Sequence, residues 1–286
     1  TALRTALWLL TDSAYKDALS SYFRKKAKRV NRVQKKPVDS LSQEKAIELV
    51  EPIKTLDADR RAWAQQARQL SGAFKGREGI VDGSVVIRGE RVRTWLVNSE
   101  SSKVIREYVI YSVSIDGVSR APDGLFLEQG KTLYGRTWNE LHQSGRLDAA
   151  AQAVRADLDA LRKAPVADPY TGPAILEAEA TGVFFHETLG HRLEGERQND
   201  EEEGQTFKGQ LGTAIIPTFV TVRDDPTLSH YDGHALNGWY GIDDEGVQAR
   251  NVVLVENGVL KTFLTSRTPI EGVPHSNGHG LSLIHI

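Results

Sequence analysis

The sequence has no cysteine and no methionine among its 286 residues. Without cysteine, the chain can form no disulfide framework and can offer no thiolate to a metal. It also lacks any apolar run near the roughly 18 residues that a membrane-spanning helix needs. Its net charge is only −2, which gives no overall attraction to nucleic acid or to an anionic membrane. These absences predict a protein without a membrane span and argue against nucleic acid as a partner.

The chain also lacks an initiator methionine, because its first residue is Thr1. We therefore expect the natural N-terminus, with any export signal, to be missing from this sequence. We predict a cytoplasmic location, and an exported one stays open for the same reason. With 40% hydrophobic and 26% charged residues, a chain of this length can bury a sizeable core, and we expect two domains.

Residues 1–165 are predicted to form an N-terminal α/β domain that begins with a helical segment, 1–72. Apolar residues recur at helical spacing over 3–18 and again over 46–56. The basic run at 24–36 could contact nucleic acid or an acidic partner. We interpret it as a solvated helix end and linker, because few aromatic residues are interleaved with the charges.

From about Gly79 the pattern changes from helix to strand, and a helical pattern then returns over 138–163. Over 104–113 one of the two alternating sets of residues is more apolar than the other, which predicts a sheet with one solvated face. The proline-containing stretch 165–169 is the best candidate for a domain boundary. The strands are expected at 80–87, 91–98, 104–115 and 118–127.

Residues 166–286 are predicted to form a second domain that is rich in β-strands. We expect a strand at 174–180 that leads into a helix, and further strands at 213–222 and 252–264. The pair Asn257-Gly258 is a strong signal for a type I′ hairpin turn. The predicted fold class is therefore α+β: N-terminal helices and an antiparallel sheet, followed by a β-rich domain with a metal-binding helix.

The most informative motif is His186-Glu187-x-x-x-His191. Neutral histidines are good zinc ligands, and a neighbouring carboxylate can take a proton from a water molecule. In a regular α-helix, residues five apart lie about 140° apart around the axis, so the two imidazoles would diverge. A one-residue π-bulge would bring them to one face, and Gly190 is where we expect the backbone to yield. The alternative is two unrelated histidines on a buried amphipathic helix.

Five segments of the sequence, in this order, closely resemble the TldD/PmbA family of metallopeptidases, which are also called modulators of DNA gyrase. The likeness covers about residues 75–280, and the His-Glu-x-x-x-His pattern is that of the TldD-like, catalytic members. The segments are 170–177 (YTGPAILE), 182–187 (GVFFHE), 190–195 (GHRLEG), 241–246 (GIDDEG) and 255–261 (VENGVLK).

This resemblance implies a zinc peptidase in which His186 and His191 bind Zn²⁺ and Glu187 is the catalytic base. It also implies unfolded or flexible peptide substrates, admitted to a chamber formed by a homodimer or by a heterodimer with a PmbA-like partner. A non-catalytic regulatory binding protein of the gyrase-modulator type, with a vestigial metal site, is the alternative.

The third zinc ligand is the main difficulty, because catalytic zinc usually has three protein ligands. In the family it is a cysteine near the C-terminal end of the catalytic domain, and this sequence has none. The tail 281–286 also departs from the family pattern. We therefore expect residues 166–286 to be a catalytic domain that is incomplete in this sequence and binds zinc weakly. His230, His234 and Glu194 are weaker candidates for the third ligand.

Three acidic clusters have no role that spacing alone can assign. Glu201, Glu202 and Glu203 could recruit a cation, but we interpret them as part of a solvated, mobile loop beside the site. The clusters 224–226 and 243–245 are typical of turns. The second belongs to a well-marked motif of the family.

Overall fold

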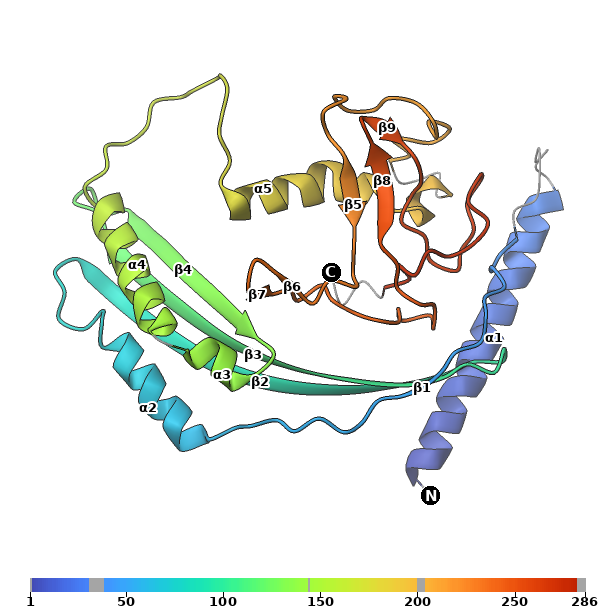
Figure 1. The fold of residues 1–286 in the computed structure, drawn as a ribbon, viewed down its shortest axis with the longest axis horizontal. Helices are drawn as coiled ribbons and strands as arrows, with labels where there is room; N and C mark the ends of the chain where they lie inside the picture. Colours follow the sequence, from blue (N-terminus) through green and yellow to red (C-terminus); the bar gives the residue numbers. More distant parts are fainter. Residues whose placement is uncertain (1, 31–38, 144, 200–203, 282–286) are drawn as a thin grey trace. The chain divides into compact units, whose positions relative to one another are not determined.

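A computed structural model describes residues 2–30, 39–143, 145–199 and 204–281 (Figure 1). The chain separates into two compact units, Thr1–Ser40 and Leu41–Ile286. Both helices and sheets are present, so the predicted α+β class is confirmed. The boundary predicted near residue 165 falls inside the second unit and stays a prediction.

The described part of the first unit contains helix α1 (Ala2–Val30), which confirms the helix expected from the apolar spacing of 3–18. Its large apolar side chains are exposed, Leu3, Trp8 and Leu10 among them. The basic run at 24–36 extends beyond the described residues. No helix in the described part of the chain is both long and apolar enough to cross a membrane.

The second predicted helix, over 46–56, is wrong. Residues Glu48–Val50 form strand β1, which pairs in parallel with β3 (Lys103–Arg120). The pairing is extended on both sides, because the N–H of Lys103 donates to Ile47 and that of Glu51 donates to Ile105. Pro52 lacks the N–H that a helix would need at this point. The helical segment 1–72 is therefore interrupted over 39–59.

The next helix, α2 (Arg60–Ser71), begins at Asp59. The Asp59 carboxylate accepts the N–H groups of Arg61 and Ala62, each at 3.0 Å, which is the usual way to satisfy the free donors at a helix start.

Strands β2 (Ile80–Val97), β3 and β4 (Phe126–Gly135) form an antiparallel arrangement, which β1 completes as a four-stranded sheet. The strands expected at 80–87 and 91–98 are one strand, β2, and the one expected at 104–115 continues to Arg120 as β3. Most of β4 lies beyond the fourth expected strand, 118–127. Gly89 and Gly117 lie inside strands, at positions where only glycine fits. A Cβ would fall 2.7 Å from the Trp63 ring at Gly89 and 2.6 Å from Leu158 Cδ1 at Gly117. These glycines permit close packing of helices on the sheet and mark no turn.

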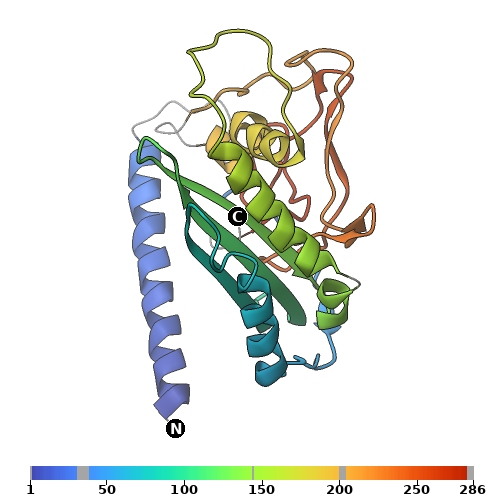
Figure 2. The same ribbon diagram turned by 90° about the vertical axis from the view of Figure 1, so that its left-hand side faces the viewer.

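Three helices cover the sheet: α2, α3 (Trp138–His142) and α4 (Arg146–Leu161), with α2 and α4 running across it in Figure 2. The predicted alternation in β3 is confirmed, since every second residue from Glu107 to Ser119 is buried. The core beneath the helices is made by Leu70, Phe74, Val109, Tyr111, Val113, Ile115, Leu141, Leu147, Val154 and Leu158.

The strand predicted at 174–180 is not formed, because helix α5 (Ala178–Phe185) begins within it. Residues 174–177 pair with no neighbouring strand in the described chain. The Thr181 hydroxyl instead donates to the carbonyl of Leu176 at 2.9 Å, which fixes the turn into α5.

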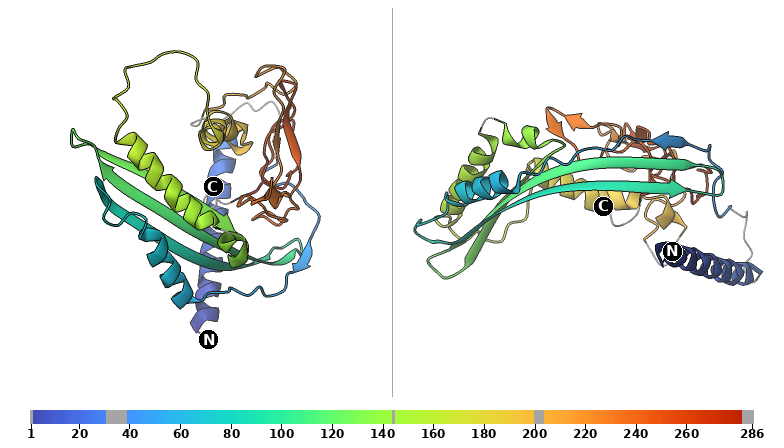
Figure 3. Two further views of the ribbon diagram at one scale, coloured as in Figure 1. Left: turned by 60° about the vertical axis from the view of Figure 1, so that its left-hand side comes forward. Right: turned by 90° about the horizontal axis from the view of Figure 1, so that it is seen from below.

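The C-terminal sheet has the order β5 (Val222–Asp224), β8 (Val252–Glu256), β9 (Val259–Leu260). The predicted hairpin turn at Asn257-Gly258 is confirmed, with φ values of +49° and +80°. Most of the strand expected at 213–222 is irregular. A separate short hairpin joins β6 (His230–Tyr231) and β7 (His234–Ala235), and Figure 3 gives two further views of these elements.

Candidate metal centre

The helix that carries the motif changes from α to π at the first histidine. Helix α5 ends at Phe185 and a π-helical turn, η1, spans His186–Gly190. The N–H of His191 donates to the carbonyl of His186, which is the i to i+5 hydrogen bond that the spacing predicts. A short 3₁₀ turn, η2 (His191–Leu193), follows. The predicted backbone distortion is therefore confirmed.

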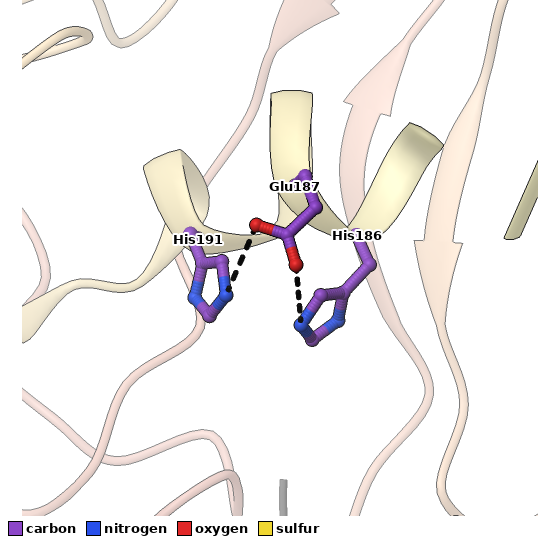
Figure 4. A group of neighbouring side chains, drawn as sticks. All are labelled: His186, Glu187 and His191. Atoms are coloured by element: carbon purple, nitrogen blue, oxygen red, sulfur yellow. Dashed lines mark ion pairs between the residues drawn. The ribbon is translucent and has the colours of Figure 1, made fainter. Parts of the chain in front are cut away.

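The π-turn brings the two imidazoles together (Figure 4). The ring centroids of His186 and His191 are 4.5 Å apart, with an interplanar angle of 71°. Glu187 lies between them, and its Oε1 and Oε2 atoms are each 3.9 Å from an Nε2 atom, of His186 and His191 respectively. One ligand atom from each of the three residues lies within 4.8 Å of the others, and no other His, Asp and Glu side chains in the described residues form such a group.

The motif is exposed to solvent on one side and anchored on the other. The side chains of His186 and Glu187 are 46% and 62% exposed, and that of His191 is 28% exposed. Leu189 and Leu193, on the opposite side of the turns, are buried in the second hydrophobic core. These leucines hold the π-turn against β8 and β9 while the three polar side chains face outward. The remaining members of this core are Val252, Leu254, Val255, Leu260, Phe263 and Ile270.

Glu194 is not part of the three-residue group, but it contacts one member directly. Its Oε1 is 2.6 Å from Nδ1 of His191, and its Oε2 accepts the Nε–H of Arg197 at 2.7 Å. The sequence placed Glu194 among the weaker ligand candidates and did not identify Arg197. The spacing His-x-x-Glu-x-x-Arg, which puts neighbours one helical turn apart, was the available signal.

The other candidates for a third ligand lie elsewhere. His230 and His234 are in the β6–β7 hairpin, outside the group formed by the motif. The Nδ1 atom of His230 is 3.0 Å from the Ser229 hydroxyl. Glu201, Glu202 and Glu203 lie outside the described residues.

The cluster Asp243-Asp244-Glu245 has a structural environment that the sequence could not reveal. The Asp243 carboxylate is buried and accepts three backbone N–H groups, from Glu245, Val247 and Gly280. Burial raises the pKa of Asp243 above its ordinary value, although those three donors favour the ionised form. This arrangement is typical of a turn whose carboxylate replaces missing backbone partners.

The backbone of Gly190 has a conformation that any L-amino acid can adopt, so this position does not require glycine. Its φ and ψ are −52° and −60°, and an added Cβ would lie 3.6 Å from the Phe185 carbonyl oxygen, an ordinary contact. We therefore expect Gly190→Ala to change the free energy of unfolding by less than about 1 kcal/mol, in the stabilising direction, because alanine favours helices over glycine. Thermal unfolding measures the effect.

Gly195→Ala is the matched comparison. A Cβ at Gly195 would lie 2.8 Å from the Leu264 oxygen, so this variant should clearly lower the Tm. If Gly190→Ala lowered the Tm as much as Gly195→Ala, the π-turn would depend on glycine after all.

Comparison with known proteins places the motif in a recognised domain. Residues 169–282 match the family described as PmbA/TldA metallopeptidase C-terminal domain. A metalloprotease of Archaeoglobus fulgidus is 32% identical over 202 residues, which are 66% of this chain and 44% of that protein. A zinc metalloprotease TldD homolog of Saccharolobus solfataricus is 36% identical over 99 residues, 33% of this chain and 20% of that protein.

The fold has a counterpart among solved structures. The crystal structure of TldE from Thermococcus kodakarensis superposes with a TM-score of 0.57 at 20% identity, over 87% of this chain and 55% of that one. The chain thus spans less than half the length of the two curated relatives and about half of the solved one.

Proposed function

The chain belongs to the PmbA/TldD family of metallopeptidases, and from that premise we propose that it is a zinc-dependent peptidase of the TldD-like type, with its centre at His186, Glu187 and His191. The observation that carries the proposal is the π-turn, because it places two imidazoles and one carboxylate on the same side of a helix. Such distortions of a helix occur preferentially at functional sites.

The donor atoms fit a zinc ion in kind and spacing. Imidazole nitrogen is a common zinc ligand at about 2.0–2.1 Å, so two ligands in a tetrahedral site lie roughly 3.3 Å apart. The three ligand atoms within 4.8 Å of one another are near that spacing, and the exposed His186 side chain has room to adjust. His186 and His191 would hold the ion. Zinc bound there would polarise the scissile carbonyl and acidify a water molecule.

Glu187 is assigned to proton transfer. Its two oxygens are equally far, 3.9 Å, from the two Nε2 atoms, so the carboxylate faces the space between the histidines. From there it would accept a proton from the attacking water at Oε1 or Oε2 and pass it to the leaving amine. The same carboxylate could instead serve as a third ligand, and the two roles make opposite predictions for zinc content.

For the substrate and the assembly, the proposal follows the family resemblance. The substrates would be unfolded or flexible peptides, admitted to an enclosed chamber. The active assembly would be a dimer, either of two copies of this chain or with a PmbA-like partner.

Removing either histidine should abolish zinc binding. We expect His186→Ala and His191→Ala each to weaken zinc affinity by more than about 100-fold. Even the loss of a residue that only hydrogen-bonds to a zinc ligand lowers metal affinity about 10- to 100-fold. Competition with a colorimetric chelator measures the affinity of the full chain, which we expect to be modest because His186 and His191 are only two of the usual three ligands.

His230→Ala and His234→Ala are the controls for this experiment, and both should bind zinc like the parent. Zinc binding that survives the loss of His186 and His191 would refute the proposed centre. A parent chain that binds no zinc would favour a non-catalytic regulatory protein.

A further inference from the structure

We propose that Glu194 is a positioning residue that fixes the tautomer and orientation of His191. The inference rests on the proposed function only for the identity of the metal. Glu194 Oε1 lies 2.6 Å from Nδ1 of His191. Because a carboxylate oxygen accepts, Nδ1 carries the ring proton in this contact. Nε2 then keeps its lone pair, on the side of the ring that faces Glu187.

Glu194 can orient a histidine because it is itself held at several points. Its second carboxylate oxygen accepts from Arg197 at 2.7 Å. Its backbone forms a parallel bridge with Leu264, flanked by two hydrogen bonds: the N–H of Leu264 donates to Leu193 at 2.8 Å, and the N–H of Gly195 donates to Leu264 at 2.7 Å. The close contact of Gly195 with the Leu264 oxygen leaves this segment little freedom to move.

The two histidines are therefore held in different ways. In the described structure, His186 has its ring contact with His191 and a 3.9 Å approach to Glu187, and no acceptor lies at its Nδ1 atom. Its side chain is also more exposed, 46% against 28%. We infer that His191 is the preorganised ligand and that His186 adjusts when the metal arrives. Carboxylates that hold a histidine in this manner commonly raise metal affinity.

An ordinary surface ion pair between Glu194 and Arg197 would be the simpler explanation, because oppositely charged residues close in the sequence often pair. Such a pair would affect stability slightly and would leave the His191 tautomer unchanged. The tautomer is thus the measurement that separates positioning from a structural role.

Long-range ¹H–¹⁵N correlation spectra of the metal-free chain report which imidazole nitrogen carries the proton. They should be recorded about two pH units above the ordinary histidine pKa of about 6.5. In the parent we expect His191 to be protonated at Nδ1 alone. Glu194→Ala should give the mixture of tautomers found in free imidazole, and Glu194→Gln should keep the Nδ1–H form, because the amide oxygen still accepts.

Glu196→Gln is the matched control for the loss of charge. Glu196 is exposed, and the structure shows no contact between it and His191. This variant should show the parent tautomer. If Glu194→Ala fails to fold by circular dichroism, Glu194→Leu takes its place, because leucine keeps much of the side-chain volume but offers no acceptor and should also mix the tautomers. An unchanged tautomer in the folded variant would overturn the proposal.

Zinc affinity gives the second measurement. We expect Glu194→Ala to weaken zinc binding about 10- to 100-fold, with a smaller loss for Glu194→Gln and none for Glu196→Gln. The two proposals can fail separately. Zinc binding that needs His186 and His191 but is unchanged in Glu194→Ala would overturn the positioning role alone. A tautomer that depends on Glu194 in a chain without zinc affinity would support positioning and overturn the metal centre.

Discussion

In a form of the protein that spans the whole length of its relatives, Glu187→Gln is expected to reduce peptide cleavage about 10²- to 10⁴-fold, the usual cost of losing a general base. The amide keeps the size and shape of the side chain but cannot take a proton from water at near-neutral pH. The zinc content should be unchanged, because the proposal assigns the metal to His186 and His191. Cleavage of an unstructured peptide and metal analysis of the same preparation measure both quantities.

The zinc content of this variant also separates the two roles that the geometry allows for Glu187. A variant that loses both zinc and cleavage would make Glu187 a ligand, and one that cleaves like the parent would remove it from the mechanism. Glu179→Gln is the control. Glu179 lies in the first turn of the same helix α5 and is exposed, so it loses the same charge away from the histidines.

The geometry of the candidate site was predictable because a helix has a fixed period. Two histidines five residues apart can meet only if one turn of the helix contains an extra residue. The π-turn at His186–Gly190 contains that extra residue. The role given to Gly190 was less accurate, since its backbone lies in the ordinary helical region. The spacing determined that a distortion occurs. It did not determine which residue tolerates it.

The N-terminal sheet shows where sequence patterns fail. Gly89 and Gly117 fall between the strands expected from the sequence, but each one lies inside a strand and makes room for a side chain of a helix that packs on it. The stripe over 46–56 looked helical, yet its backbone pairs with β3 because that strand offers free partners. In both cases a distant part of the chain decides the local structure, and a local pattern contains no information about it.

The same reason explains why the cluster 243–245 had no assignable role. The Asp244 carboxylate pairs with Arg106 of β3, whose guanidinium also donates to the carbonyl of Ile242. The Glu245 carboxylate accepts the N–H of Arg267 at 2.5 Å, and the buried Arg267 side chain donates to the Ser42 carbonyl. Residues far apart in the sequence thus meet at one acidic turn, which joins β3 to Arg267 and Gly280.

Arg267 has a further ion pair that extends this connection. Its Nη1 lies 2.6 Å from Glu100, in the turn between β2 and β3. The acidic turn is therefore structural in the described chain, and its residues act by holding the loops around the second core. Asp243 is the most buried residue of this turn, so its loss should lower stability more than the loss of Asp244 or Glu245.

Asp243→Ala is expected to lower the free energy of unfolding by about 3 kcal/mol or more. The substitution leaves the N–H groups of Glu245, Val247 and Gly280 without their acceptor. Those of Val247 and Gly280 are buried, and each unsatisfied buried group costs about 1–3 kcal/mol. For a chain of this size the Tm should fall by roughly 6–12 °C.

Asp225→Ala, in the acidic turn 224–226, is the control. Its carboxylate caps Thr227 near the surface, where water can replace it, so the fall in Tm should be much smaller. Calorimetry of both variants decides the matter, and equal stabilities would mean that the Asp243 turn does not hold the loops together.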